Sequence, residues 1–310
     1  KRQVEVVANI GSVADAKQAL DFGAEGVGLL RSEFLFLDRA DAPSEAEQFK
    51  VYKDIAVALG GQPVIIRTLD VGGDKPLPYV PMPAEENPFL GVRGLRLCLA
   101  RPELLRTQLR AILRAAEFGP LRVMFPMVAN VAELSAARRM VDEIQAELNS
   151  PPVEVGIMIE IPAAAVLADI FAKDVDFFSI GTNDLTQYTL AMDRGHPELS
   201  AQADGLHPAV LRLIDQTARA AHAAGKWVGV CGELGADPQA VPILVGLGVD
   251  ELSVSIPAIP AVKAQIRSLS LSTAKRLAAE ALERASATEV RRTVDSLSVR
   301  TFSKTKEAEE

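Results

Sequence analysis

The sequence predicts an α/β protein in which eight strands alternate with helices and close into a (β/α)8 barrel, the TIM-barrel fold. Short apolar segments, typical of buried strands, alternate with longer segments of helical periodicity. The length also fits, because 310 residues with 48% hydrophobic and only 5% aromatic residues can bury one large aliphatic core. An open doubly wound sheet is the alternative, but no GxGxxG segment follows any predicted strand.

The predicted strands follow one another along the chain and are separated by segments that predict helices. The strands are Val4–Ala8, Gly26–Leu30, Pro63–Ile66, Leu121–Val128, Val153–Ile161, Asp176–Ile180, Lys226–Val230 and Asp250–Ile256. The main helices are expected at 12–22, where Ser12 is the N-cap, and at 44–59, 103–118, 163–172 and 185–192.

Two segments depart from this alternation. The Pro-rich segment 76–88 predicts a loop, which we expect to lie over the mouth of the barrel. Beyond Leu271 the apolar periodicity weakens. We therefore expect residues 1–270 to form the barrel and 271–310 to form a peripheral helical tail with a disordered end.

The composition disfavours several classes of function. The net charge of −8 argues against nucleic acid or an acidic membrane surface as the main partner. No apolar segment is long enough to span a membrane and the first residues are polar, so we expect no anchor, no signal peptide and a cytoplasmic location. Because the chain does not begin with Met, we expect it to be a piece of a longer protein.

Two carboxylates follow neighbouring predicted strands. Glu160 comes after the apolar segment Ile157–Ile159, and Asp184 comes after a strand and a Gly-Thr-Asn turn. Parallel neighbours lie about 5 Å apart, so these acids can converge on one point, and two hard oxygen ligands suit Mg²⁺. Asn183 and Asp184 would also serve as helix N-caps. A buried Glu160, however, is costly unless paired or bound to metal, which favours a metal site.

Arginines follow other predicted strands. Arg31 and Arg67 come directly after the second and third, Arg194 lies ten residues beyond Asp184, and Arg93 is a fourth candidate. One arginine would be an ordinary surface charge or carboxylate partner, but several around two carboxylates require an anionic ligand. Guanidinium groups match phosphate and carboxylate oxygens in a bidentate manner. We therefore expect a small phosphorylated carboxylic acid that chelates Mg²⁺.

The two cysteines are predicted to be free thiols, because they lack the number of a disulfide framework and the spacing of a metal site. Cys98 lies on a predicted helix and is interpreted as a small core residue. Cys231 ends the apolar segment Trp227–Val230, where the ligand is expected. An unperturbed thiol has a pKa of about 8.5, so Cys231 is protonated at neutral pH unless the arginines lower its pKa. It can serve as a general acid. Lys75 is a weaker candidate for a phosphate contact, because a solvated lysine is the commoner role.

Several segments together resemble one family. They are GAEGVGLLRSEFLFLDR, VIIRTLDVGGDKPLPY, NPFLGVRGLR, MIEIPAA, SIGTNDLTQYTLAMDRG and GKWVGVCGEL. Between about Val4 and Arg267 they resemble, in order, the phosphoenolpyruvate-binding C-terminal domain of Enzyme I, the phosphoenolpyruvate–protein phosphotransferase of the bacterial sugar phosphotransferase system. The resemblance implies a barrel that forms homodimers.

The resemblance also implies a role for each candidate residue. Phosphoenolpyruvate would be held by Arg31, Arg67, Asn183, Asp184 and Arg194, with Arg93 as a further active-site arginine; Mg²⁺ by Glu160 and Asp184; and the enolate would be protonated by Cys231. Two positions depart from the family pattern, Ile161 in place of a small residue and Gly-Ala-Asp at 235–237 in place of Ala-Gly-Asp.

The implied reaction passes the phosphoryl group of phosphoenolpyruvate to a histidine of a separate N-terminal domain, releases pyruvate, and leads on to the histidine phosphocarrier protein. We expect that domain to lie outside this chain. The three histidines present, His196, His207 and His222, lie in loops or on a helix without its motif, and are interpreted as ordinary solvated residues.

Three alternatives remain. The corresponding domain of pyruvate phosphate dikinase or phosphoenolpyruvate synthase is similar, although the segment TLDVGGDKPLPY favours Enzyme I. A non-catalytic phosphoenolpyruvate sensor or dimerisation module needs no acid such as Cys231. A Mg²⁺-dependent carbon–carbon lyase is disfavoured by the number of arginines. The sugar-transport and nitrogen-regulatory branches both remain open.

Overall fold

The computed structural model describes residues 2–72 and 77–306, with side chains described as far as residue 296. In this part of the chain eight strands close into a barrel in the order β1 to β8, and all neighbours are parallel. The strands are β1 (Glu5–Ile10), β2 (Val27–Arg31), β3 (Val64–Arg67), β4 (Leu121–Phe125), β5 (Glu154–Ile159), β6 (Phe177–Ile180), β7 (Trp227–Val230) and β8 (Glu251–Ser255). The predicted (β/α)8 barrel is confirmed, and every predicted strand overlaps an observed one.

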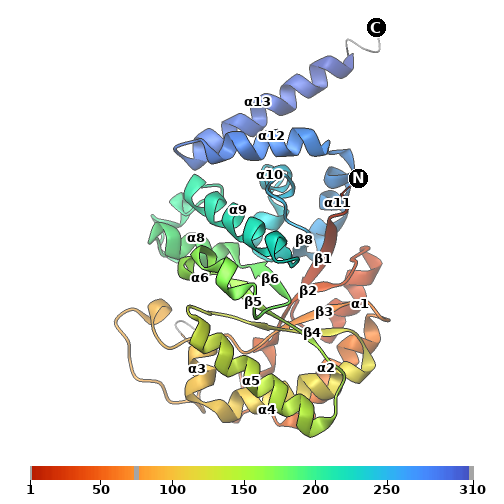
Figure 1. Ribbon diagram of the computed structural model, residues 1–310, viewed down its shortest axis with the longest axis vertical. Helices are drawn as coiled ribbons and strands as arrows, with labels where there is room; N and C mark the ends of the chain where they lie inside the picture. The colour runs from red at the N-terminus through yellow and green to blue at the C-terminus, as the bar shows by residue number, and fades with distance from the viewer. Residues whose placement is uncertain (1, 73–76, 307–310) are drawn as a thin grey trace.

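Helices surround the barrel (Figure 1). They are α1 (Val13–Asp21), α2 (Glu45–Ala58), α3 (Leu95–Ala100), α4 (Pro102–Ala115), α5 (Val131–Leu148), α6 (Pro162–Val166), α7 (Ala168–Phe171), α8 (Thr182–Leu190), α9 (Pro208–Ala223), α10 (Ala240–Leu247), α11 (Ile259–Ser268), α12 (Leu271–Leu282) and α13 (Ala287–Lys306). Short 3₁₀ helices span Ser32–Leu35, Pro88–Leu90, Ala116–Phe118, Ser200–Gln202, Glu233–Ala236 and Ile256–Ala258.

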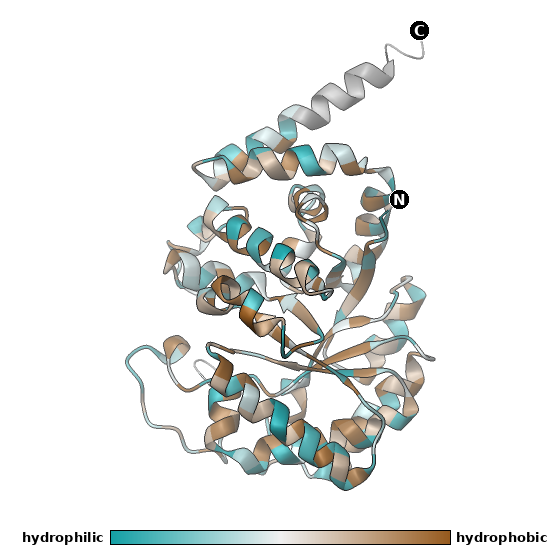
Figure 2. Ribbon diagram, viewed as in Figure 1, coloured by the Kyte–Doolittle hydropathy of each residue, from teal (hydrophilic) through white to brown (hydrophobic). Residues whose placement is uncertain are grey.

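Apolar side chains fill the inside of the barrel as well as the layer between strands and helices. The inner cluster is Leu29, Ile65, Met124, Met158, Phe177 and Cys231. Figure 2 shows the strands as largely hydrophobic and the helices as mixed, as expected for helices with one face toward the strands and one toward solvent. Because this interior is packed, a ligand can bind only where the strands end.

Local sequence explains where several helices begin. Ser12 accepts a hydrogen bond from Asp15 N at the start of α1, as predicted. Ser44 and Glu47 form a capping box on α2. The predicted helix at 163–172 is divided into α6 and α7, because Leu167 leaves helical geometry (φ −99°, ψ 20°).

The start of α8 differs from the capping alternative for Asn183 and Asp184. The helix begins at Thr182, and Gly181 occupies the cap position without a side-chain cap hydrogen bond. Capping is therefore the wrong interpretation of these two residues, since both lie in the first turn of the helix, directly after β6.

The C-terminal tail forms two helices, α12 and α13, outside the barrel (Figure 1). Gly246 of α10 lets α12 approach closely, because a Cβ there would collide with the carbonyl oxygen of Ala274. Val290 and Val294 of α13 are buried. The expected disordered end includes residues 307–310, which lie outside the described residues. Within the described ranges, no helix is both long and apolar enough to cross a membrane.

Candidate active site

The structure brings the predicted site residues to the C-terminal mouth of the barrel. Arg31 ends β2 and Arg67 ends β3, and the two are direct partners in the register of these strands. Glu160 follows β5, and Cys231 follows β7. Arg93, Asn183, Asp184 and Arg194 lie on the loops and the helix around them. Lys75 lies outside the described residues.

Arg67 is buried between two carboxylates. Its Nη2 donates to Glu33 Oε1 at 2.9 Å, and its Nη1 lies 3.0 Å from Asp70 Oδ2. Burial alone would lower the pKa of Arg67, but these carboxylates more than offset that effect and raise it. Its Nε has no hydrogen-bond partner among the described residues. The guanidinium therefore stays charged and keeps one donor free.

Arg93 lies at the end of the long loop before α3, and its side chain binds carboxylates at the mouth of the barrel. Its Nε and Nη2 donate to Asp70 at 2.9 and 3.0 Å, and its Nη1 and Nη2 donate to Asp184 at 3.1 and 3.4 Å. Gly72 allows this arrangement: its φ is 120°, and a Cβ there would lie 2.5 Å from Val92 O. Tyr188 of α8 also donates to the carbonyl oxygen of Phe89, directly after the Pro-rich segment 76–88, whose position over the mouth stays a prediction.

Glu160 is completely buried. Its Oε1 accepts a hydrogen bond from Met127 N at 2.6 Å, whereas its Oε2 has no partner in the described part of the chain. Burial, followed by the charges of Asp70 and Asp184, raises its pKa to about 8. Met127 adopts a left-handed backbone (φ 58°), which costs about 1 kcal/mol for a residue other than glycine, and so directs its N–H at this carboxyl group.

Asn183 is held by the loop after β7. Its Nδ2 donates to Glu233 Oε1 at 3.2 Å, and its Oδ1 accepts from Glu233 N at 3.0 Å. The neighbouring Asp184 is buried and lies 3.7 Å from Nη1 of Arg194, whose side chain is 41% exposed. Arg31 is exposed and forms no ion pair with any described residue. Arg31 and Arg194 are thus the accessible guanidinium groups of the site.

Cys231 is buried beside these charges. Its Sγ lies 3.6 Å from Ile180 O, and burial raises the pKa of the thiol to about 11, despite the opposing effect of Arg67. The thiol therefore keeps its proton at neutral pH. The neighbouring Gly235 and Ala236, which depart from the family pattern, have no left-handed backbone. A Cβ at Gly235 would make an ordinary contact of 3.5 Å with Val254, so the exchange of glycine and alanine is sterically mild.

Sequence reasoning missed Glu33 and Asp70, which hold the arginines in place. Each follows a strand-end arginine by two or three residues, as Arg31–Glu33 and Arg67–Asp70. That spacing was a usable signal, because buried arginines need counter-charges.

The three histidines make local contacts. His207 Nδ1 accepts from Ala209 N, His222 pairs with Asp250, and His196 Nδ1 accepts from Glu198 N. None of these contacts involves the residues at the mouth.

The donor set at the mouth fits Mg²⁺. Glu160 offers a buried oxygen with no partner among the described residues, and Asp184 has oxygens that Arg93 shares but does not exhaust, since a carboxylate can accept about four hydrogen bonds. No group of three or more His, Cys, Asp or Glu residues in the described ranges could hold a metal ion. Two carboxylates, with the remaining positions left to ligand and water, are the usual protein contribution to a Mg²⁺ site.

Comparisons with known proteins show which family the chain resembles. Residues 1–271 match the family described as PEP-utilising enzyme, PEP-binding domain, where PEP is phosphoenolpyruvate. A multiphosphoryl transfer protein of Rhodobacter capsulatus is 59% identical over 289 residues, which cover 93% of this chain and 35% of that protein. The phosphoenolpyruvate-protein phosphotransferase of Haemophilus influenzae is 49% identical over 93% of this chain and 51% of its own length.

The chain spans about half the length, or less, of these relatives. Among solved structures, a citrate lyase from Burkholderia xenovorans LB400 has a TM-score of 0.55 over 98% of this chain and 94% of that chain; at 18% identity it shows the shared fold alone. The match over residues 1–271, together with relatives of about 50% identity over most of the chain, shows that this protein belongs to the family of PEP-binding domains of PEP-utilising enzymes.

Proposed function

We propose that this chain is the PEP-binding and dimerisation domain of a phosphoenolpyruvate–protein phosphotransferase. In this proposal it supports Mg²⁺-dependent transfer of the phosphoryl group of PEP to a histidine of a separate N-terminal domain, with release of pyruvate. The observation that carries the proposal is the pair of buried atoms without partners in the described residues, Arg67 Nε and Glu160 Oε2. The first is a donor for an anionic oxygen, and the second is an acceptor suited to a cation.

The charges at the mouth favour an anion. Four arginines (Arg31, Arg67, Arg93 and Arg194) gather with four carboxyl groups (Glu33, Asp70, Glu160 and Asp184). Since the raised pKa of Glu160 lets it keep a proton up to about pH 8, the four arginines exceed the three carboxylates that pair with them, Glu33, Asp70 and Asp184, at neutral pH. Arg31, Arg194 and Nε of Arg67 can then bind phosphate and carboxylate oxygens, and Asn183 is held within reach by Glu233.

The residues of this chain supply most of the proposed chemistry. Glu160 and Asp184 would hold Mg²⁺, which when bound would neutralise negative charge on the phosphoryl group and on the enolate oxygen. The bond from phosphorus to the enol oxygen breaks as the bond to the histidine nitrogen forms. The methylene carbon of the enolate then takes the proton of Cys231, which gives pyruvate and a thiolate that recovers a proton from solvent. Because the pKa of Cys231 is raised, the thiol enters this step protonated.

The acceptor histidine comes from outside the chain in this proposal, because the hydrogen bonds of His196, His207 and His222 involve none of the proposed site residues. The partners would be the N-terminal phosphohistidine domain, the histidine phosphocarrier protein beyond it, and a second copy of this chain, all in the cytoplasm. The barrel would span 1–270 and the tail 271–310. Relatives named phosphoenolpyruvate-protein phosphotransferase support this reading over pyruvate phosphate dikinase.

Calorimetric titration of the chain with PEP tests the proposal. We expect binding with Mg²⁺ and a large loss of affinity with EDTA, because without the cation that Glu160 and Asp184 would hold, the charge of the trianion is less fully neutralised and Asp184 repels it. The Glu160→Gln variant should lose most of the difference between the two conditions. Equal affinity of the unmodified chain with and without Mg²⁺ would contradict the metal assignment.

A further inference from the structure

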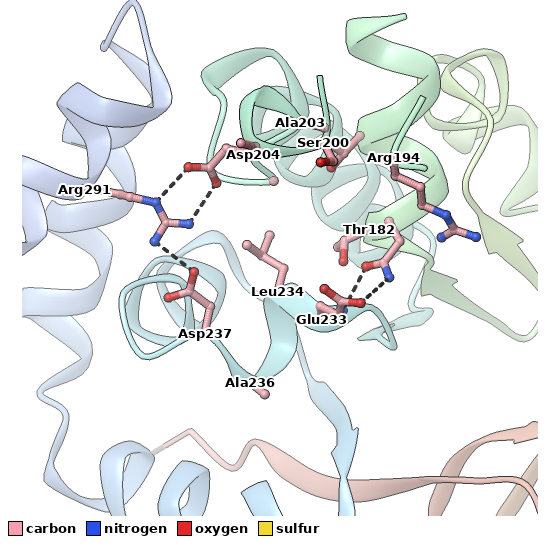
Figure 3. Close-up of a pocket in the computed structure, with 14 residues that line it drawn as sticks. Thr182, Arg194, Ser200, Ala203, Asp204, Glu233, Leu234, Ala236, Asp237 and Arg291 are labelled. Atoms are coloured by element: carbon pink, nitrogen blue, oxygen red, sulfur yellow. Dashed lines mark hydrogen bonds and ion pairs between the residues drawn. The ribbon is translucent and has the colours of Figure 1, made fainter. Parts of the chain in front are cut away.

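A cavity of about 700 Å³ lies beside the active site and is closed on one side by the C-terminal helix α13 (Figure 3). Asn183 and Arg194 line it on the side of the site, and Arg291 of α13 lines it on the other. The tail of the chain, predicted from the sequence as a peripheral helical segment, thus contributes a side chain to the surroundings of the site.

Arg291 bridges two separate loops. Its Nε and Nη2 donate to Asp204 at 2.7 and 2.9 Å, and its Nη1 lies 2.9 Å from Asp237 (Figure 3). The same Nη1 donates to Gln239 Oε1 at 2.7 Å. A guanidinium can serve these acceptors at once because its donors are fixed in one plane, which the single ammonium of a lysine cannot reproduce.

Both loops carry proposed site residues. Asp204 lies on the segment between α8 and α9, which also contains Arg194. Asp237 ends the 3₁₀ helix Glu233–Ala236, which begins two residues after Cys231. Arg291 therefore links the segment between α8 and α9, which we call the arginine loop, to the segment after β7, which we call the cysteine loop.

The cysteine loop, residues 231–237, packs closely against the start of α8. A Cβ at Gly232 would collide with Thr182 Oγ1, so the loop touches the first residue of α8. The next residue of the loop, Glu233, makes two hydrogen bonds with Asn183 of α8. A shift of this loop must therefore move Cys231, Asn183 or both.

The helix that carries Arg291 is itself firmly anchored. Val290 and Val294 are buried on either side of Arg291 along the helix, and Gln239 donates to Asp295 at 2.6 Å. Arg291 therefore lies on a helix whose position is fixed by packing, and its side chain can hold both loops.

We propose that Arg291 is a positioning residue, which holds the loops of Arg194 and Cys231 in place from the C-terminal helix and keeps the Cys231 thiol enclosed at the mouth. Its consequence for catalysis rests on the proposed function, but its effect on the two loops does not. The enclosure can therefore be measured without any substrate.

The experiment measures alkylation of the two cysteines by iodoacetamide in the full chain, with mass spectrometry to read Cys231 and Cys98 separately. We expect Arg291→Ala to raise the rate at Cys231 by about tenfold or more, which corresponds to about 1.4 kcal/mol of easier local opening. The rate at Cys98, which is buried in α3 far along the chain, should not change. Arg291→Lys should give an intermediate rate at Cys231, because it keeps one ion pair.

Arg212→Ala is the matched control. Arg212 of α9 also ties the C-terminal helices to the barrel, through the carbonyl oxygen of Leu282, and among the described residues it forms no hydrogen bond or ion pair with either loop. It should leave both rates unchanged. Equal acceleration of alkylation at Cys98 and Cys231 in Arg291→Ala would overturn the proposal, because it would indicate general unfolding. If Arg291→Ala does not fold, the ratio of the Cys231 rate to the Cys98 rate in Arg291→Lys decides. An unchanged Cys231 rate would also overturn it.

A second readout separates this inference from the proposed function. With the N-terminal histidine domain supplied, Arg291→Ala should slow proton exchange into pyruvate about tenfold more than it weakens PEP binding, since it displaces the acid more than the arginines. If the unmodified chain binds no PEP, the proposed function fails while the alkylation result stands. If PEP binds and both readouts are unaffected by Arg291→Ala, only the positioning role fails.

Discussion

Each mouth of the barrel buries a glutamate. Glu160 follows β5 at the C-terminal mouth and is completely buried, whereas Glu251 begins β8 at the opposite mouth and is 3% exposed. Burial is the main cause that raises the pKa of both carboxyl groups to about 8, and each has one oxygen without a partner among the described residues.

The surroundings of the two glutamates differ. Glu160 receives a hydrogen bond from Met127 N and faces Arg67 and Arg93. Glu251 has Glu5 as its partner on β1, and Arg122 is the cation that lowers its pKa. Burial of a glutamate, which predicted the metal site, therefore does not identify a site by itself, because the same cost applies to Glu251. Converging arginines and free donors distinguish the C-terminal mouth.

We therefore expect changes at the C-terminal mouth to alter binding and chemistry, and changes at the N-terminal mouth to alter stability alone. Cys231→Ala should have the largest effect. With the histidine domain supplied, it should slow exchange of the pyruvate methyl protons with deuterated water by about 10²–10⁴-fold, the usual contribution of a general acid. PEP affinity measured by calorimetry should survive.

Cys98→Ala is the control for this change and should affect neither measurement. Loss of PEP binding in Cys231→Ala would show that the thiol is structural, and normal exchange would assign the acid to another group.

Glu251→Gln should change the pH dependence of stability. The folded protein keeps the proton of Glu251 up to about pH 8, whereas the unfolded chain releases it near the ordinary value of 4.5. Stability is therefore lost as pH rises through this window, on the order of 5 kcal/mol for a shift of this size. Urea unfolding at pH 5 and pH 9 should show a smaller loss in the variant, with the remaining loss due to Glu160.

Glu154→Gln, an exposed glutamate at the same mouth, should keep the full pH dependence. Weaker PEP binding in Glu251→Gln would contradict the separate roles of the two mouths.

Arg67→Lys should weaken PEP binding by about 10- to 100-fold. The guanidinium of Arg67 pairs with two carboxylates and still has its Nε for the ligand, whereas a lysine keeps the charge but has a single ammonium group. Calorimetry with Mg²⁺ present measures this. Arg138→Lys, on the outer helix α5, is the control and should bind normally. If both variants behave alike, Arg67 is not a ligand of PEP.

Arg122→Ala should have the smallest effect. Arg122 lies 5.1 Å over the ring of Trp227, which stacks on Phe177 at 4.7 Å, and it pairs with the exposed Glu154. Loss of these contacts should lower the free energy of unfolding by about 1 kcal/mol, read from the fluorescence of Trp227 in urea, and leave PEP affinity unchanged. A change in affinity would show that the two mouths are coupled.

The sequence alone was sufficient for the barrel and for the position of most candidate residues. A strand followed directly by Arg31, Arg67, Glu160 or Cys231 puts that residue at the C-terminal mouth whatever the rest of the chain does, because parallel strands all end at the same edge. Strand and helix patterns depend on neighbours a few residues apart, so they can be recognised in a linear sequence.

Only the tertiary structure decided which groups meet. Arg93 pairs with Asp184, which is 91 residues away in the sequence, and Arg291 pairs with Asp204, which is 87 residues away. These pairs form because barrel closure brings distant loops together, and no local pattern specifies which loop will lie opposite another. The helix start at Thr182 has a similar cause, since β6 ends at Ile180, Gly181 occupies the cap position, and the loop at Gly232 packs against the first turn of α8.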